Sequence, residues 1–172
     1  EDLQKGLIER FRSLPMARSA VLFGRTISDA VRNVFVLILI TLVGFAVGFR
    51  IGTSFGLYLV AFALLILFAF CFSWVFAFIG LSASNSETAG LMAFPILFPL
   101  TFASTAFVPS STMPSWLRVF AEHQPVSLVI NSVRALTQGG ETARWVIPAL
   151  IWCVALLAIF APLAVWRYRR TT

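Results

Sequence analysis

Few side chains in this sequence are of the types that carry out covalent or acid–base chemistry. His123 is the only histidine, and it stands between Glu122 and Gln124. Cys71 and Cys153 lie inside apolar stretches, with no second Cys or His at the spacing of a metal site or a redox pair. We therefore expect a turn residue at position 123, two small packing residues at the cysteines, and no metal or other cofactor bound by the chain itself.

The sequence also lacks the organisation of the common catalytic folds. It has no phosphate-binding G-x-x-x-x-G-K-[ST] motif, no H-E-x-x-H zinc motif and no nucleophile elbow. Its apolar stretches hold no pair of polar groups that could act as acid and base. These absences predict a protein that is not itself an enzyme.

The first part of the chain carries an amphipathic pattern. One predicted helical face is apolar and consists of Leu3, Leu7, Ile8, Phe11 and Leu14. The other face is charged and consists of Glu1, Asp2, Lys5, Glu9, Arg10 and Arg12. Pro15 lacks an N–H and disfavours a helical residue before it, so this helix should end there. The segment is too short and too charged to cross a membrane and is typical of a surface-lying helix.

The rest of the chain is mostly apolar. The 172 residues are 59% hydrophobic and 12% charged, whereas a soluble domain has about 25% charged residues. A bilayer core of about 30 Å requires about 20 helical residues. Four predicted spans meet this requirement: 30–49, 55–81, 88–108 and 145–166. The fold class is therefore all-α: a polytopic transmembrane helical bundle, formed by one domain over 1–172.

The basic residues predict the orientation of the bundle. The net charge of +6 comes from Lys and Arg that flank apolar runs, so it indicates membrane topology and not a nucleic-acid partner. The more basic side holds nine of them: Lys5, Arg10, Arg12, Arg18, Arg25, Arg32, Arg167, Arg169 and Arg170. The other side holds four: Arg50, Arg118, Arg134 and Arg144. We therefore expect a multi-pass protein of the cell membrane with a cytoplasmic N-terminal segment (1–29) and tail (167–172).

After Pro15 a second helix can run unbroken from about Met16 into the first span. It should overshoot the bilayer and project into the cytoplasm. Arg25, Asp29 and Arg32 follow one another at helical spacing and are suited to ion pairing. Because a charge at mid-membrane is costly, Asp29 and Arg32 should lie at the membrane edge or face protein.

The third predicted span carries prolines and hydroxyls. Pro95 and Pro99 remove two backbone donors from one helical face, so the helix should kink, and Thr101, Ser104 and Thr105 can supply hydroxyl partners. These residues have two interpretations, helix packing or a lining of a translocation path. Glu87 suits the first turn of this helix, where it stabilises the positive end of the dipole, and a secondary cytoplasmic contact is its alternative role.

Residues 109–144 are predicted to form an external, re-entrant or surface-lying helical hairpin. Pro114 and Pro125 each look like a helix start, and Gly139 with Gly140 like a helix end. Apolar residues repeat along the second helix at 126, 129, 130, 133 and 136, with Asn131, Arg134 and Gln138 expected to face away.

Two segments resemble a known family. "EDLQKGLIERFRSLPMARSAVLFGRTISD" (1–29) resembles the cytoplasmic segment between the second and third membrane helices of ABC-2 type permeases, in particular the daunorubicin-resistance-like export subunits of actinobacteria. "FVPSSTMPSWLRVFAEHQPVSLVINSVRAL" (107–136) resembles the signature before that family's last helix. The resemblance implies a permease of about six membrane helices, two of which would precede residue 1.

The resemblance also implies roles for individual residues. The first segment would contact a separate ATPase subunit through Leu7, Arg10, Phe11, Arg12, Leu14, Pro15, Arg18, Arg25 and Asp29. The translocation path and its external gate would include Pro95, Pro99, Thr101, Ser104, Pro109, Pro114 and Pro125.

We therefore expect the membrane subunit of an ATP-driven exporter, working as a dimer of permeases. ATP and Mg would be bound by the partner ATPase, and the cargo would be a hydrophobic or amphiphilic small molecule or a lipid. The alternative is a non-transporting membrane scaffold or assembly protein whose basic front helix binds anionic membrane lipid.

Overall fold

The computed structural model describes residues 18–108 and 112–171 of the chain, and all of the regular structure in these ranges is helical. This confirms the predicted all-α class. The helices are α2 (Arg18–Val47), α3 (Phe55–Ser82), α4 (Ser86–Phe102), α5 (Ser115–His123), α6 (Pro125–Gln138) and α7 (Thr142–Thr171). The helix predicted to run unbroken into the first span is α2, which is continuous over 30 residues.

Three helices are long and apolar enough to cross a membrane. Their candidate spans are Ile27–Val47, Phe55–Ser82 and Thr142–Arg169. Helix α4 has 17 residues and ends at Phe102, not at residue 108, so its rise is about 26 Å against a bilayer core of about 30 Å. The fourth crossing therefore stays a prediction. The helix ends early because the chain turns at Ala103 and docks on α6.

Local sequence signals set the other helix ends. Asn85 and Ser84 are the two residues before this helix that could cap it, and the Asn85 side chain does so by accepting the N–H of Thr88 at 2.7 Å. Gly139 follows α6 with a φ of +96°, a conformation that costs glycine little, which confirms the predicted helix end. Pro125 begins α6 in the first turn, where its missing N–H is not needed.

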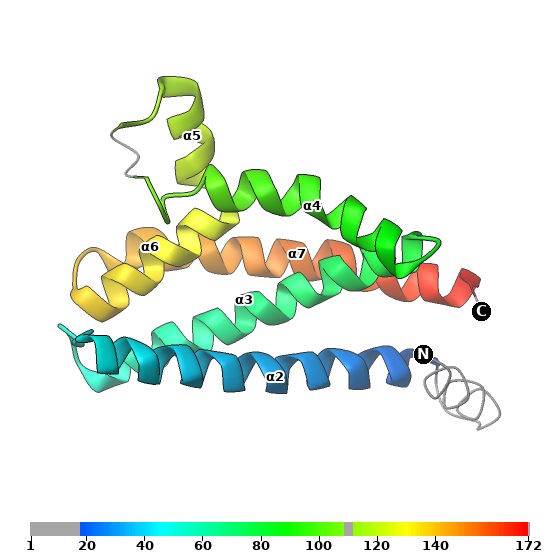
Figure 1. Ribbon diagram of the computed structural model, residues 1–172, viewed down its shortest axis with the longest axis horizontal. Coiled ribbons are helices and arrows are strands. Elements are labelled where there is room, and N and C mark those ends of the chain that lie inside the picture. The colour runs from blue at the N-terminus through cyan, green and yellow to red at the C-terminus, as the bar shows by residue number, and fades with distance from the viewer. Residues whose placement is uncertain (1–17, 109–111, 172) are drawn as a thin grey trace.

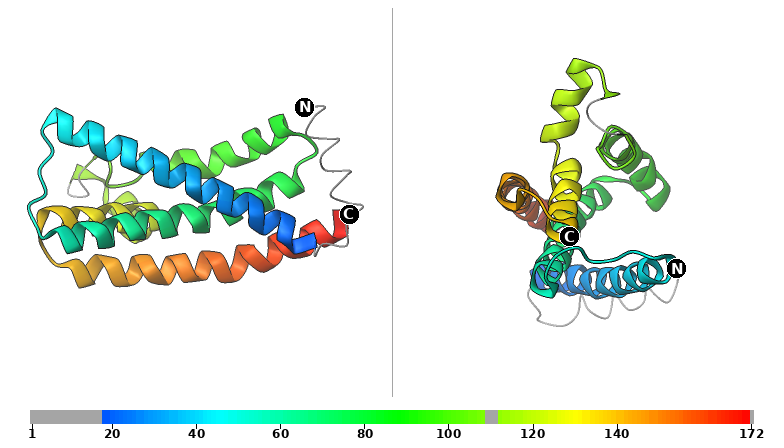
Figure 2. Two further views of the ribbon diagram at one scale, coloured as in Figure 1. Left: turned by 90° about the horizontal axis from the view of Figure 1, so that it is seen from below. Right: turned by 90° about the vertical axis from the view of Figure 1, so that its left-hand side faces the viewer.

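Helices α3, α6 and α7 form the packed centre of the molecule. Leu128 and Val129 of α6 pack against Ala149 of α7, and Leu136 of α6 packs against Ala61 and Leu64 of α3. Figure 1 shows α6 between the first turns of α3 and α7, and the end view in Figure 2 shows α2, α4 and α5 standing away from this centre. The predicted hairpin helix α6 is thus part of the bundle core and does not lie on its surface.

The two ends of the described chain lie at the same end of the molecule (Figures 1 and 2). The start of α2, the α3–α4 turn and the end of α7 gather there, and the α2–α3 and α6–α7 loops lie at the opposite end. We call this opposite end the hairpin end. The arrangement agrees with a chain that returns to its starting side, while the side that faces the cytoplasm stays a prediction.

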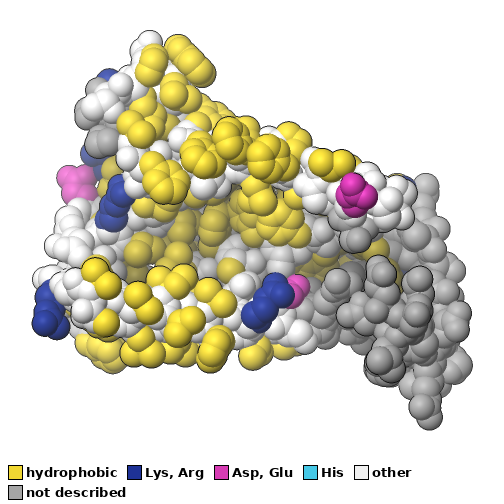
Figure 3. Space-filling view, viewed as in Figure 1, with side chains coloured by type: hydrophobic (Ala, Val, Ile, Leu, Met, Phe, Trp, Pro, Cys, Tyr) yellow, Lys and Arg dark blue, Asp and Glu magenta, His cyan; other side chains and the backbone are white. Residues whose placement is uncertain are grey.

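The long helices expose apolar surface that a soluble protein would bury. None of the described side chains of α2 is buried. Figure 3 shows a hollowed face between α2 and α4 with hydrophobic side chains along both helices. Such a surface requires lipid or another protein helix as its neighbour.

Two buried thiols mark the contact between α3 and α7. Cys71 is 0% exposed and Cys153 is 1% exposed, and their side chains form a hydrogen bond with one another. Both cysteines are free. They serve as small packing residues, as their apolar surroundings in the sequence predict.

The thiol contact allows a test of the α3–α7 packing. Because the two buried thiols interact across the α3–α7 contact, iodine is expected to oxidise Cys71 and Cys153 to a disulfide in the membrane-embedded protein, with release of two equivalents of iodide and two protons. After unfolding, maleimide should label two thiols in untreated protein and none after iodine. The Cys71→Ala variant should keep one label in both cases. Two labels after iodine would show that α3 and α7 pack in another register.

Candidate functional site

The residues predicted to couple to an ATPase fall into two groups. Six lie outside the described residues: Leu7, Arg10, Phe11, Arg12, Leu14 and Pro15. The others lie on α2, toward the end of the molecule opposite the hairpin end. Arg18 and Arg25 lie on the first turns of α2. Their coupling role stays a prediction.

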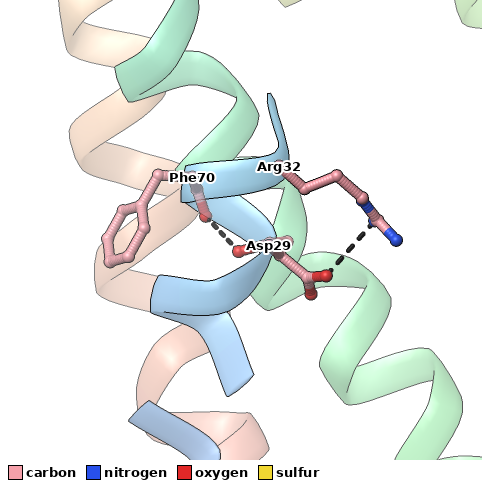
Figure 4. A network of polar contacts seen from close by, with 4 residues as sticks. Asp29, Arg32 and Phe70 are labelled. Carbon is pink, nitrogen blue, oxygen red and sulfur yellow. Dashed lines mark hydrogen bonds and ion pairs between the residues drawn. The ribbon is translucent and has the colours of Figure 1, made fainter. Parts of the chain in front are cut away.

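Asp29 and Arg32 form the ion pair that their spacing predicts. The Arg32 guanidinium lies 3.2 Å from the Asp29 carboxylate. Figure 4 shows the Asp29 carboxylate pointing toward Arg32, with Phe70 of α3 nearby. The Arg32 side chain is 73% exposed and the Asp29 side chain 37% exposed, and their pairing reduces the cost of placing both charges at the start of a membrane span. Their position at the membrane edge stays a prediction.

Glu87 lies in the first turn of α4, next to the Asn85 cap. It is exposed, so its carboxylate can stabilise the positive end of the helix dipole without being desolvated. This is the structural role expected for it. A contact with a cytoplasmic partner stays a prediction.

Helix α4 carries a row of aromatic rings. Phe94 and Phe98 lie 5.4 Å apart between ring centres, Phe98 and Phe102 4.5 Å, and Phe102 and Phe107 5.9 Å. All four side chains are exposed. Pro95 and Pro99 lie inside the same helix and are also exposed, so the backbone groups that they leave unpaired lie on a helix with little packing around it.

Beyond α4 the chain turns sharply at a buried serine. Ser104 is 0% exposed; its hydroxyl donates to the Thr101 carbonyl at 2.6 Å and accepts the Ala106 N–H at 3.2 Å. The Ser104 hydroxyl therefore closes the end of α4 through local backbone contacts. At position 101 it is the backbone carbonyl, and not the predicted hydroxyl, that takes part.

The turn is fastened to the start of α6 by buried polar groups. The Gln124 side-chain amide donates to the Leu100 carbonyl at 2.9 Å and to the Ser127 hydroxyl at 2.9 Å. The same hydroxyl accepts the Thr105 N–H at 3.0 Å. Gln124 is 4% exposed and Ser127 is 0% exposed, so water cannot replace these partners at low cost.

Two further α6 side chains hold the same turn. The Thr105 hydroxyl donates to the Asn131 side-chain oxygen at 3.2 Å. The Arg134 guanidinium donates to the carbonyls of Thr105 and Ala106 at 2.9 and 3.2 Å. We call this set the α4–α6 polar joint, and it consists of Ser104, Thr105, Gln124, Ser127, Asn131 and Arg134.

The other end of α6 is fastened to the α2–α3 loop. The Thr53 hydroxyl donates to the Leu136 carbonyl at 2.6 Å, and the Gly52 N–H donates to the Thr137 carbonyl at 2.9 Å. The Gln138 amide reaches the Arg50 carbonyl at 3.5 Å. Helix α6 is thus held at its start to α4, at its end to the loop before α3, and along its length to α3 and α7.

Sequence reasoning missed the joint, although a signal was present. Asn131, Arg134 and Gln138 were expected to face away, whereas each contacts a neighbouring segment. Together with Gln124 and Ser127 they form a polar stripe at spacings of three and four. A second stripe on a helix that already has an apolar one indicates two packed faces.

Two of the three prolines predicted for the external gate lie at helix starts. Pro114 is the residue before α5, and Pro125 is buried in the first turn of α6. Pro109 lies outside the described residues. On α5 the apolar side chains of Trp116 and Phe120 are exposed.

Residues 52–56 carry the letters G-T-S-F-G, which match the nucleophile motif G-x-S-x-G, contrary to the expectation that no such motif occurs. The structure gives Ser54 another role. Its hydroxyl oxygen caps α3 by accepting the Leu57 N–H at 3.4 Å, and a loop precedes it in place of a strand. His123, whose Nδ1 binds the Val119 carbonyl at 2.9 Å, is not its partner.

No group of three His, Cys, Asp or Glu side chains comes together within 18–108 and 112–171. The candidate site is therefore the α4–α6 polar joint, where side-chain hydrogen bonds hold the end of α4 against α6.

Residues 2–137 match the family model described as ABC-2 type transporter. The chain belongs to the ABC-2 type transporter family. It is 36% identical over 170 residues to the daunorubicin resistance ABC transporter permease protein DrrB1 of Streptomyces coeruleorubidus, covering 98% of this chain and 59% of that protein. It is 26% identical over 169 residues to the probable doxorubicin resistance ABC transporter permease protein DrrC of Mycobacterium tuberculosis, covering 97% of this chain and 60% of that protein.

This ABC-2 chain thus spans about three fifths of the length of the curated relatives that it matches. No solved structure matches it significantly. The family and the apolar helices together make it a multi-pass membrane protein of the permease type.

Proposed function

We propose that the chain forms part of a permease that moves a hydrophobic or amphiphilic small molecule or a lipid out of the cell, driven by a separate ATPase subunit. The printed names of its relatives, permease proteins of daunorubicin and doxorubicin resistance, support export of such compounds. A non-transporting scaffold has no support among these relatives.

The observation that carries the proposal is the α4–α6 polar joint. Buried hydrogen bonds inside a membrane bundle hold their partners in one geometry, because breaking them leaves polar groups without water. The joint fastens a proline-containing helix with little packing, α4, to the helix that is most tightly held, α6. Such a contact is suited to a gate that is closed in one state and open in another.

The path runs along α4 in this proposal. The row of exposed phenylalanines from Phe94 to Phe107 offers a flat, adaptable apolar surface to a cargo of varied shape. Pro95, Pro99, Thr101 and Ser104 shape this helix and its end, and Pro109, Pro114 and Pro125 shape the external side of the gate. A second permease copy would complete the path by covering the apolar face between α2 and α4.

The energy for transport comes from ATP on the cytoplasmic side. Binding of ATP and Mg would close the ATPase subunit, and this movement would push on the segment from Leu7 to Arg18. Helix α2, which is about 45 Å long by its rise per residue, would carry the push into the membrane, with Asp29 as part of the segment that receives it and Glu87 as a secondary contact. In this orientation both ends of the chain are cytoplasmic, and the hairpin end faces outward.

Charge reversal at the front segment tests this proposal. The double substitution Arg10→Glu and Arg12→Glu is expected to lower co-purification of the ATPase by about tenfold or more, because each basic contact becomes repulsive. Export should fall with it, while membrane insertion is unchanged. The matched control is Arg169→Glu with Arg170→Glu, at the same end of the molecule, which should keep the ATPase.

The scaffold alternative predicts another result. If the front segment only binds anionic lipid, the unaltered protein in neutral-lipid membranes should behave like the double mutant. If the ATPase stays bound to the double mutant, the coupling role is wrong.

A further inference from the structure

A cavity of about 420 Å³ opens at the hairpin end of the molecule. It lies between the last turn of α5, the start of α6 and the first turns of α7. Leu128, Pro148 and the rings of Trp145 and Trp152 form apolar walls, and the cavity is open on one side. Neither the polar joint nor the phenylalanine row of α4 contributes to it.

The cavity brings together charges of both signs. Arg144 supplies the positive charge, with its guanidinium carbon 5.2 Å from the centre of the Trp145 ring. Its ion pair with Glu141 is exposed and occupies one nitrogen at 3.5 Å. A guanidinium has five N–H donors in a planar fork and binds phosphate well.

Glu122 and His123 supply acceptors on the opposite wall. The His123 Nδ1 lies 2.9 Å from the Val119 carbonyl, which can only accept, so Nδ1 carries the proton and Nε2 is an acceptor in the neutral ring. The Trp152 indole N–H donates to the His123 carbonyl at 3.1 Å and holds the end of α5 on α7. Carboxylate, imidazole and indole faces together favour an ammonium group.

The position of the cavity along α7 matches the edge of a bilayer. Trp145 and Arg144 lie in the first turn of a helix whose apolar stretch begins at Thr142. Further along α7, Ile147, Leu150, Ile151 and Val154 line a shallow apolar hollow of about 310 Å³. A charged, aromatic cavity at the headgroup level and an apolar hollow one to two turns deeper is the arrangement that a single lipid molecule requires.

We propose that this cavity binds a phospholipid headgroup that carries both a phosphate and an ammonium group. Arg144 contacts the phosphate, Glu122 with the indole of Trp152 contacts the ammonium, and an acyl chain lies in the hollow along Ile151 and Val154. The lipid fixes the end of α5 to α7 and so stabilises the hairpin. This inference requires α7 to span the membrane, but it does not depend on transport.

Native mass spectrometry of the purified protein in nonionic detergent tests the proposal. Three lipids with the same acyl chains are added together: phosphatidylethanolamine, phosphatidylglycerol, which lacks the ammonium, and a trimethylammonium-propane lipid, which lacks the phosphate. Phosphatidylethanolamine is expected to bind about tenfold more tightly than either, the factor for one additional charge-assisted contact.

Single substitutions test which residue binds the ammonium group and which binds the phosphate. Glu122→Gln should reduce phosphatidylethanolamine binding to the level of phosphatidylglycerol, and Arg144→Gln should reduce it to the level of the cationic lipid. Arg50→Gln at the same end of the molecule and Glu87→Gln at the opposite end are matched controls and should change neither. Ratios within one sample are compared, because a misfolded variant would lose all three lipids alike.

Three results would overturn the proposal. They are equal binding of the three lipids, a preference that survives both Glu122→Gln and Arg144→Gln, and a preference that Arg50→Gln abolishes to the same extent as Arg144→Gln.

Discussion

Oxidation of a protein carrying Thr105→Cys and Asn131→Cys is expected to stop export, and reduction to restore it. The two native side chains meet at 3.2 Å, so we expect thiols introduced at these positions to come close enough to form a disulfide between the end of α4 and α6. In the proposed function the gate opens when the α4 turn moves away from α6. A covalent link holds the turn in place, and transport should fall to background.

The measurement is efflux of a fluorescent hydrophobic dye from cells that also contain the ATPase subunit. The cysteines at 71 and 153 are first replaced by alanine, so that only the introduced pair can react. Each single cysteine variant is the control, and it should export equally with and without oxidant. Full export by a protein whose disulfide is verified by mass spectrometry would show that the joint does not open during transport.

Removal of one hydroxyl from the joint is expected to destabilise the bundle strongly. Ser127→Ala leaves the Thr105 N–H and the Gln124 amide without their shared acceptor at a site that is 0% exposed. Each unsatisfied buried donor costs about 1–3 kcal/mol, so the free energy of unfolding should fall by about 2 kcal/mol or more. Unfolding in detergent by urea, followed by tryptophan fluorescence, measures this loss.

Ser132 provides a matched control on the same helix. It is also 0% exposed, but its hydroxyl donates only to the Leu128 carbonyl within α6, at 2.6 Å. That carbonyl keeps its helical partner, so Ser132→Ala should cost about 0.5 kcal/mol or less. Equal losses in the two variants would mean that the hydroxyl at 127 acts by packing alone, and that the joint contributes little to stability.

The elements of this fold could be predicted from the sequence wherever the controlling interaction is local. The Asn85 cap, the proline at the start of α6 and the glycine after its end act within one helical turn. The membrane-spanning parts of α2, α3 and α7 could also be predicted from their apolar sequences, because the bilayer requires a fixed length of apolar helix. The Asp29–Arg32 pair belongs to the same class, since both partners lie on one helix.

The candidate site depends on contacts between residues far apart in the chain. The sequence offered prolines and hydroxyls on the third apolar stretch and a polar stripe on α6, but it could not show that they meet. Thr105 and Ser127 lie 22 residues apart, and Thr53 and Leu136 lie 83 residues apart. Residues 103–108 were predicted to continue the third span for the same reason. Their apolar letters could not show that Thr105 binds Ser127 and Asn131 of α6.

The sequence by itself determined an all-helical membrane protein and the main helix boundaries, because periodicity, capping and apolar length are properties of single segments. The family was indicated by the resemblance of two segments and is shown by the family match over residues 2–137. Only the tertiary structure decided that α4 stops at Phe102, that α6 is a central helix, and that the side chains of Gln124 and Ser127 hold the two together. The physical reason is that a buried polar group is stable only with a partner, and the partner is supplied by the packing of distant segments.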